Sequence, residues 1–442
     1  MGEFDRKLIA QQRLDVAQTG TLYASQSLTM PVTVTEPALK DARILLLGDS
    51  RMAFPIAKAL SKQGASVFAG VSVYSNYLEW SRYVVRTFQH PSTDTGTDEA
   101  LPYILHWLDQ NAPITAIQPV SESATRLISR HRSLFESYAR LIMPSADTVK
   151  ACGRKSEMFE TCDALGIPLA PYRIVTSKRE LFDAAADIGF PVIVKPSCVD
   201  AELCGRKALI IHSTADLNIW VTEWPEIHPE LIVQRFVRGP RHSVVFSAEQ
   251  GKILKAVEVL AQRTHENDGT GYTTLGIAIE PTPVVKAATE ALVKHLNYSS
   301  TGCTQFIVDP NSGEVTFMEL NPRTSLARIA EAAGVPHSVL GFETALGLAH
   351  ADLGAAWSIK TGTRYAWTKG DIMRLKRGLK SRQIKPIAIV PELFKIGIDA
   401  LRAEHAILDL SDPAPAIGTY FNVFLKHARR QRTYDLEMEP AI

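Results

Sequence analysis

The feature that most constrains the fold of this chain is a pair of short apolar segments joined by a dense turn sequence. Residues 303–308 and 314–320 are rich in apolar and β-branched side chains, which favour strands. Residues 309–313 read DPNSG, and these residue types favour tight turns. The sequence therefore predicts a β-hairpin over this stretch.

Polar side chains are expected on one face of this hairpin. A turn that pairs Val308 with Glu314 places Gln305 opposite Phe317, and side chains alternate between faces along a strand. Three oxygen-bearing side chains then share one face: Gln305, Glu319 and Asn321. Oxygen ligands suit a hard cation such as Mg²⁺, so we expect a metal site here, with Arg323 just beyond it.

The composition is that of an ordinary globular protein. With 442 residues, of which 45% are hydrophobic and 21% charged, the chain is long enough for two or three domains. Its formal net charge of +1 gives no reason to expect a nucleic-acid partner. The five cysteines lack the spacing of a zinc or redox motif, which indicates buried or unreactive thiols in a reducing compartment.

The sequence shows neither a membrane span nor a secretory signal. No segment reaches about 18 uninterrupted apolar residues, and charged residues at positions 3–7 precede any apolar run. We therefore expect a cytoplasmic protein. Residues 1–40 lack sustained periodicity and are expected to form an extended tail.

Residues 41–142 alternate between apolar strand segments and amphipathic helix segments, which predicts a small parallel α/β domain with helices on both faces of its sheet. The predicted elements are strands at 44–47, 67–71 and 114–120 and helices at about 51–60 and 101–109. A dinucleotide site is disfavoured because Gly48 has no glycine two or five residues later. The other interpretation is a scaffold domain that lends Ser121 and Glu122 to a shared cleft.

Two lysines lie where an anion would be a natural partner. A helix is predicted over about residues 150–165, and Lys155 lies in its first half, where a lysine is most often a solvated surface charge. Lys195 ends the apolar strand GFPVIVKPS of residues 189–197, where an ammonium without an anion would be costly. A phosphate suits such a point charge.

Four features in this order resemble the ATP-grasp superfamily. They are Lys155 eleven residues before Gly166, the GFPVIVKPS strand, the LIVQRFVRG segment at 231–239 and the QF…MELNPR hairpin. The hairpin is particularly similar to the amino-terminal ATP-binding half of the carbamoyl-phosphate synthetase large chain, in which glutamine also takes the metal-facing position on the first arm. The resemblance covers about residues 43–348.

This resemblance implies an α/β fold with an α+β ATP-grasp core. The small domain at 41–142 would be followed by an ATP-grasp domain at 143–350, with its lid at about 175–237, and by a C-terminal extension at 351–442.

The resemblance also implies roles for individual residues. Lys155 and Lys195 would hold the phosphates of ATP, and Arg323 would act with Lys195 in catalysis by meeting the transferred phosphate or the acyl phosphate. The hinge against which adenine docks would consist of Gln234, Arg235, Phe236 and Val237. Mg²⁺, with Mn²⁺ as an alternative, would face Gln305, Glu319 and Asn321. These roles agree with phosphoryl transfer, which depends on positioning and charge neutralisation.

Two segments depart from the family pattern. The flap at 198–207 holds one glycine where many members have several, so the phosphates would be covered by Arg206 or Lys207, or these would be solvated loop charges. Residues 239–241 read Gly-Pro-Arg where the family usually has Gly-x-Glu, so the expected ribose carboxylate is missing. Glu258 is either a substitute for it or a solvent-facing strand residue.

Two later regions bear on the substrate. Residues 265–274, HENDGTGYTT, resemble the variable loop near the acceptor, and His265 is open between a surface histidine and a catalytic base. A basic run within 374–385 is spread around a helix, which favours a solvated face over a nucleic-acid or lipid surface. Residues 367–372 and 406–415 are similar to the tail of mycosporine-glycine synthase-type ligases, which also have a glycine-poor flap.

The resemblance implies an ADP-forming carboxylate–amine ligase. ATP would phosphorylate a carboxylate or, in the mycosporine-type case, an enolised ketone, and an amine, expected to be that of an amino acid, would displace phosphate to form a C–N bond. The alternative is a non-catalytic nucleotide-binding regulatory or scaffold protein. The partners expected are small-molecule substrates, and a homodimer is left open.

Overall fold

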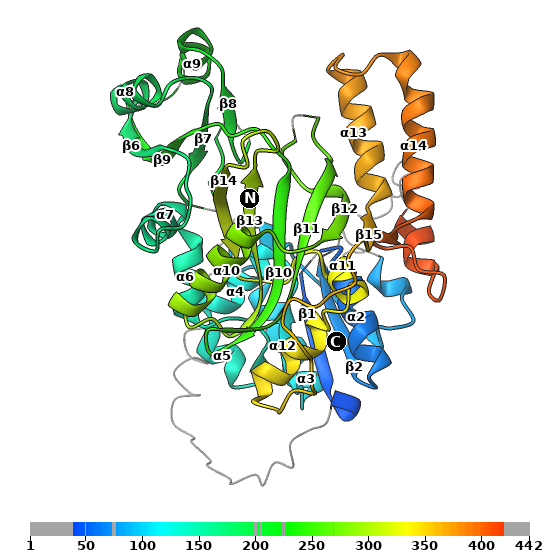
Figure 1. Ribbon diagram of the computed structural model, residues 1–442. Helices are drawn as coiled ribbons and strands as arrows, with labels where there is room; N and C mark the ends of the chain where they lie inside the picture. Colours follow the sequence, from blue (N-terminus) through cyan, green and yellow to red (C-terminus); the bar gives the residue numbers. More distant parts are fainter. Residues whose placement is uncertain are drawn as a thin grey trace, which may run out of the picture. The chain divides into compact units, whose positions relative to one another are not determined.

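The computed structural model describes residues 39–419 except 49, 73–76, 199–200, 204–205, 223, 225 and 268. The tail predicted at residues 1–40 lies almost entirely outside the described residues. The described residues belong to one compact unit and form three sheets with flanking helices (Figure 1). The mixed α/β class predicted from the sequence is confirmed.

The first sheet is parallel, with strand order β3-β2-β1-β4-β5. Its strands are β1 (Arg43–Leu47), β2 (Ser66–Ser72), β3 (Arg86–His90), β4 (Ala116–Pro119) and β5 (Arg140–Leu141). Its helices are α2 (Ala53–Lys62), α3 (Leu101–Asn111), α4 (Glu122–Arg130) and α5 (Arg132–Glu136). The apolar run of β1 is buried on both faces, because Ile44 packs with α2 and Leu45 packs with α3. The strands and helices predicted between residues 44 and 120 are confirmed, with ends that differ by a few residues.

The single helix predicted over residues 150–165 is wrong. The chain forms two helices, α6 (Ala146–Gly153) and α7 (Lys155–Ala164), because Arg154 between them has extended backbone angles (φ −121°, ψ 109°). Arg154 forms an isolated β-bridge with Cys198, just beyond strand β7. Lys155 is therefore the first residue of a helix, next to the end of that strand.

The second sheet has four antiparallel strands in the order β6-β9-β7-β8. Its elements are β6 (Tyr172–Ser177), α8 (Lys178–Ile188), β7 (Val192–Pro196), β8 (Leu209–Ile211), α9 (Thr214–Val221) and β9 (Ile227–Arg235). Leu181 of α8 and Leu217 of α9 pack on Val194 of β7, so both helices cover the same face of the sheet. Lys195 and Gln234 project from the opposite face.

The third sheet has seven strands in the order β14-β13-β10-β11-β12-β15-β16. Its strands are β10 (Arg241–Glu249), β11 (Lys252–Thr264), β12 (Thr273–Ile279), β13 (Ser300–Val308), β14 (Val315–Asn321), β15 (Arg364–Ala366) and β16 (Glu404–His405). Phe306 and Phe317 on one face pack with α7 and α10 (Pro283–His295), and Val245 and Cys303 on the other face pack with α11 (Ala327–Ala332). Helix α12 (His337–Leu346) follows α11.

The C-terminal region adds helices α13 (Thr368–Lys380) and α14 (Ile389–Leu401), which run side by side (Figure 1). Short 3-10 helices are η2 (Leu39–Asp41), η3 (Leu78–Trp80), η4 (Thr93–Thr95) and η5 (Pro386–Ala388). Within the part of the chain that the structure describes, every helix is too short or too polar to cross a membrane.

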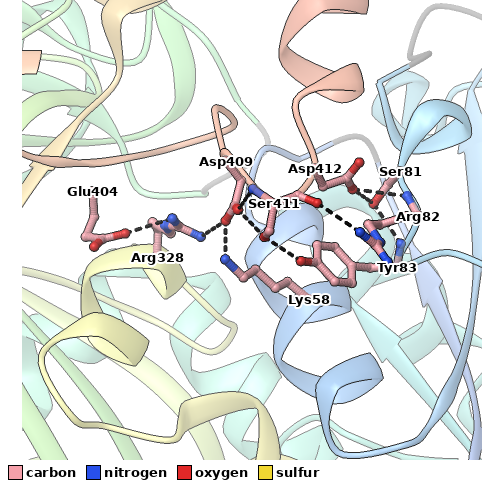
Figure 2. Close-up of polar contacts among 9 residues, drawn as sticks. All are labelled: Lys58, Ser81, Arg82, Tyr83, Arg328, Glu404, Asp409, Ser411 and Asp412. Carbon is pink, nitrogen blue, oxygen red and sulfur yellow. Dashed lines mark hydrogen bonds and ion pairs between the residues drawn. The ribbon is translucent and has the colours of Figure 1, made fainter. Parts of the chain in front are cut away.

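The segment after β16 contacts α2, α11 and the residues after η3 through ion pairs and hydrogen bonds (Figure 2). The Asp409 carboxylate pairs with Lys58 of α2 and accepts a hydrogen bond from Arg328 Nη1 of α11 at 2.9 Å. Ser81 Oγ donates to Asp412 Oδ2 at 2.7 Å. The Asp409 side chain is only 5% exposed, and two cations offset the cost of burying its charge.

Candidate active site

Lys155 and Lys195 are brought together where α7 meets the end of β7. The Lys155 N–H donates to the Ser197 carbonyl at 2.9 Å, and Lys155 Nζ donates to the Pro196 carbonyl at 3.3 Å. Ser156 Oγ lies 2.7 Å from Ser197 Oγ and donates to Glu230 Oε1 at 2.6 Å. These contacts fix the first turn of α7 against the strand that carries Lys195.

The Lys195 side chain is buried and the Lys155 side chain is partly buried. Lys195 Nζ donates to Gln234 Oε1 at 3.1 Å and lies 4.7 Å from the centroid of the Phe159 ring. Among the described residues, no carboxylate lies within the 4.0 Å of an ion pair from either lysine. Burial, followed by the charge of Lys155, lowers the pKa of Lys195 to about 8, and Glu319 opposes the shift. Burial also lowers the pKa of Lys155, against the charges of Glu319 and Glu122.

The hairpin forms, but its predicted register is wrong. Val308 pairs with Val315 rather than with Glu314, and Phe306 pairs with Phe317. A β-bulge at Met318 then brings Gln305 opposite Glu319. The bulge adds one residue, so Phe317 points into the apolar core and Glu319 points to the other face.

The three oxygen-bearing side chains of the hairpin do share that face. Glu319 pairs with Gln305 across the strands, and Asn321 Nδ2 donates to Glu319 Oε1 at 2.8 Å. One carboxylate and two amide oxygens are hard ligands that fit Mg²⁺ or Mn²⁺. Within the described ranges, no group of three or more His, Cys, Asp or Glu side chains could hold a metal ion, so a site here depends on the amides.

Arg323 lies at the end of the hairpin and faces the first sheet. Its Nη1 donates to Ser325 Oγ at 3.1 Å, and its Nη2 lies 3.9 Å from Glu122 Oε2 at the start of α4. Its Nε is buried without a hydrogen-bond partner. Glu122 therefore reaches the site as predicted, whereas Ser121 accepts the N–H of Ala124 and caps α4.

Two backbone N–H groups of the hinge expected at residues 234–237 already have acceptors within the protein. The N–H of Arg235 donates to the Pro171 carbonyl at 2.9 Å, and that of Phe236 donates to the Pro191 carbonyl at 3.0 Å. The Arg235 side chain pairs with Glu314, and Gln234 is bonded to Lys195. An adenine at this hinge must therefore use carbonyl groups, the N–H of Val237 or the apolar wall.

The flap lies partly outside the described residues, which omit Val199, Asp200, Cys204 and Gly205. Arg206 is exposed, and its guanidinium carbon lies 5.6 Å from the centroid of the Trp220 ring on α9. The charge of Lys207 contributes to the lowered pKa of Lys155, although burial is the main cause.

Two residues near the hinge differ from their predicted surroundings. Glu258 is 1% exposed and accepts hydrogen bonds from the N–H and hydroxyl of Thr282 at 2.7 and 2.8 Å, with His242 Nδ1 2.6 Å away. It is neither a solvent-facing residue nor available to a ribose. Arg241 is on the same face of β10 as Ser243, which pairs with Gln305, so it points toward the hairpin oxygens.

His265 is not a surface histidine. Its side chain is buried, its Nδ1 accepts the N–H of Tyr272 at 2.8 Å, and burial lowers its pKa. Its ring stacks on Tyr272 at 5.3 Å and packs near Trp367 at 6.0 Å. The guanidinium of Arg51 lies over the Tyr272 and Trp367 rings. Sequence reasoning missed this residue, because only its position after β1 pointed to a ligand site.

Comparisons with known proteins identify relatives of the central part of the chain. Residues 155–349 match the family model described as carbamoyl-phosphate synthase L chain, ATP binding domain. Carbamoyl phosphate synthase large chain, C-terminal section, of Methanopyrus kandleri is 24% identical over 276 residues, covering 58% of this chain and 49% of that protein. The chain spans about half or less of the length of the first curated relatives it matches.

Solved structures share the fold. Biotin carboxylase of Campylobacter jejuni, in a beta-gamma-ATP complex, has a TM-score of 0.57 at 17% identity, covering 74% of this chain and 75% of that one. The biotin carboxylase domain dimer of Hydrogenobacter thermophilus 2-oxoglutarate carboxylase, with MgADP, ADP and bicarbonate, has a TM-score of 0.56 at 18% identity, covering 73% of each chain.

Proposed function

Because the chain belongs to the ATP-grasp superfamily, we propose that it is an ADP-forming ligase that activates a carboxylate or an enolised ketone and joins it to an amine. The observation that carries this proposal is the pair formed by the partly buried Lys155 and the buried Lys195. Neither forms an ion pair with a carboxylate among the described residues, and the charge of Glu319 acts on both. A polyphosphate with a divalent cation supplies the missing negative charge for the lysines and the missing positive charge for Glu319.

Each residue has a role in this proposal. Lys155 and Lys195 hold the phosphate oxygens of ATP, and Gln234 orients Lys195 through its hydrogen bond of 3.1 Å. Glu319, with Gln305 and Asn321, holds Mg²⁺ or Mn²⁺, which neutralises phosphate charge when bound. Residues 234–237 line the adenine side, and Arg323 stabilises charge on the acceptor oxygen.

The reaction has two balanced steps. The acceptor oxygen attacks the terminal phosphorus of ATP, and ADP leaves with the electron pair of the broken P–O bond. The amine nitrogen then attacks the activated carbon, phosphate leaves with the C–O electron pair, and the nitrogen loses a proton. Phosphoryl transfer of this kind needs cations and positioning more than it needs a nucleophile from the protein.

The test is release of ADP from Mg·ATP in the presence of pairs of amino acids with carboxylate or cyclic-ketone acceptors. Glu319→Gln should fold normally and lose about 10²–10³ in rate, because it removes the charge that holds the metal. The matched control is Glu136→Gln, which breaks a surface ion pair with Arg132 on α5 and should retain the wild-type rate.

Two outcomes would contradict the proposal. Unchanged turnover in Glu319→Gln would remove the metal assignment. Binding of Mg·ATP without turnover for any pair of substrates would favour a non-catalytic nucleotide-binding protein.

The C-terminal similarity to mycosporine-glycine synthase-type ligases motivates including the cyclic ketones. The homodimer expected as one option is tested by sedimentation of the same samples.

A further inference from the structure

Arg51 is held at the carboxyl end of β1 by aromatic residues from distant parts of the chain. Its guanidinium carbon lies 4.3 Å from the centroid of the Trp367 ring and 4.8 Å from that of Tyr272. Its Nε donates to the hydroxyl of Tyr365, which is fully buried, at 3.2 Å. The carboxyl ends of parallel strands are where open α/β sheets bind ligands, so Arg51 lies at a place where a ligand contact is expected.

These contacts fix Arg51 without neutralising it. Aromatic rings attract a cation through their faces but contribute no negative charge, whereas a carboxylate would pair with the guanidinium and occupy its forked end. Among the described residues, no carboxylate forms an ion pair with Arg51. With Nε bonded to Tyr365, the two terminal nitrogens of the fork are left for an oxyanion.

Arg241 supplies a second cation nearby. It lies on the face of β10 that also presents Ser243, and its Nη2 donates to Thr273 Oγ1 at 3.0 Å. Its Nε is buried and has no hydrogen-bond partner. Burial lowers the pKa of Arg241, the charge of Arg51 lowers it further, and Glu319 opposes the shift. Two like charges in a partly desolvated place are costly unless an anion lies between them.

This pair is separate from Arg323. Arg323 follows β14, which is two strands away from β10 in the sheet order, so about 10 Å separates the two strands at the usual spacing. Arg323 is also tied to Ser325 and Asn321 by its own hydrogen bonds. Arg323 therefore starts from a different strand than Arg51 and Arg241 and has different hydrogen-bond partners.

We propose that Arg51 and Arg241 bind a second carboxylate of the acceptor substrate, so that the acceptor is a dianion with its reacting oxygen beside Arg323 and its other carboxylate under the Tyr272 and Trp367 rings. This inference rests on the proposed function for the identity of the acceptor site. It assigns the variable loop and the C-terminal region a shared part in substrate recognition, because Tyr272 comes from the loop and Trp367 precedes α13.

The test compares dicarboxylates with monocarboxylates by calorimetry at constant ionic strength. Succinate, glutarate and 2-oxoglutarate are titrated into the full chain, with and without Mg·ADP, against butyrate as the monocarboxylate. At least one dicarboxylate should bind ten or more times more tightly than butyrate. Arg51→Lys should remove most of that preference, because an ammonium cannot form the planar two-bond contact.

The matched control is Arg43→Lys. Arg43 lies at the amino end of the same strand, also over an aromatic ring, with its guanidinium carbon 5.1 Å from the Phe68 centroid. This variant should retain the wild-type preference. Arg241→Lys should also reduce the preference for dicarboxylates. If Arg51→Lys fails to fold, Arg241→Lys alone tests the proposal.

Three results would overturn the inference: absence of binding by every dicarboxylate, equal loss in Arg43→Lys, or weakened Mg·ADP binding with unchanged dicarboxylate binding in Arg51→Lys. The last result would assign Arg51 to the nucleotide. Dicarboxylate binding is also measured without nucleotide. Failure of Mg·ADP to bind the wild type would count against the proposed function. The comparison of dicarboxylate and butyrate affinities without nucleotide would still test the present inference.

Discussion

Lys195 is the residue whose charge depends most directly on the ligand. Its pKa of about 8 lies below the ordinary lysine value of 10.5 because the side chain is buried beside Lys155. The unfolded chain therefore binds this proton more tightly than the folded protein does. It follows that the free energy of unfolding without nucleotide rises with pH between about 8 and 10.5.

Nucleotide binding should reverse that shift. Phosphate oxygens favour the charged ammonium, so Lys195 takes up a proton on binding when the pH is near or above its free value, and affinity falls as the pH rises through about 8. Calorimetry of Mg·ATP binding in buffers of different ionisation enthalpy should show uptake approaching one proton at about pH 9 and little at about pH 7.

The test variant is Lys195→Met, which should abolish the proton uptake. The control is Lys252→Met, at an exposed position at the start of β11, which should retain the proton uptake. Uptake that is the same in Lys195→Met as in the wild type would show that another group titrates.

At the scale of elements, the junction between β7 and α7 places the two lysines together. Ser197 at the end of β7 accepts the N–H of Ser156 at 3.3 Å and contacts its hydroxyl at 2.7 Å. The hydroxyl thus joins the strand that carries Lys195 to the helix that begins at Lys155.

Ser197→Ala should therefore affect both stability and binding. Loss of these hydrogen bonds should lower the free energy of unfolding by about 1 kcal/mol and weaken Mg·ATP binding by about fivefold through a looser Lys155. Ser177→Ala is the matched control, because Ser177 accepts the Glu180 N–H at 3.3 Å and caps α8 in the same sheet. It should cost about 1 kcal/mol of stability and leave the affinity unchanged. Equal affinities in both variants would contradict the role of the junction.

Much of this arrangement could be predicted from local patterns. Apolar runs predicted β1 and β7, and turn residues predicted the hairpin, because these signals act over a few neighbouring residues. The break at Arg154 was missed because a bridge to Cys198, distant in sequence, pulls the backbone out of the helix. The bulge at Met318 was missed because packing of Phe317 against Phe159 and Phe306 sets the register, not the turn alone.

The residues of the candidate site were predictable to different degrees. Lys155, Lys195, Glu319 and Arg323 stand in motifs with fixed spacing, and the structure gathers them around one place. The surroundings of Glu258 and the cluster around Arg51 were not predictable, because they join strands and loops that are far apart in the chain. Such contacts depend on the tertiary fold, and a single sequence carries no direct signal for them.

At the scale of the whole molecule, three sheets and the C-terminal region contribute residues to the proposed site. The second sheet provides Lys195, the hairpin of the third provides Glu319, and the loops and helices that follow strands of the first provide Glu122 and Arg51.

The contacts of Asp409 with Lys58 and Arg328 hold the C-terminal segment to α2 beside the first sheet and to α11 (Figure 2). These cations hold the pKa of Asp409 far below its usual range, against the effect of burial, so this part of the stability is present above about pH 4 and is lost as the pH falls.

The central claim is that Lys155 and Lys195 form the phosphate-binding half of a Mg·ATP site. The most direct measurement is calorimetric titration of Mg·ATP into the wild type, the Lys155→Met/Lys195→Met variant and the control Lys150→Met/Lys252→Met, whose lysines are exposed. We predict binding to the wild type and the control, and a loss of about 100-fold or more in the first variant, equivalent to about 2.7 kcal/mol. Undiminished affinity in that variant, or no binding to the wild type, would contradict the account.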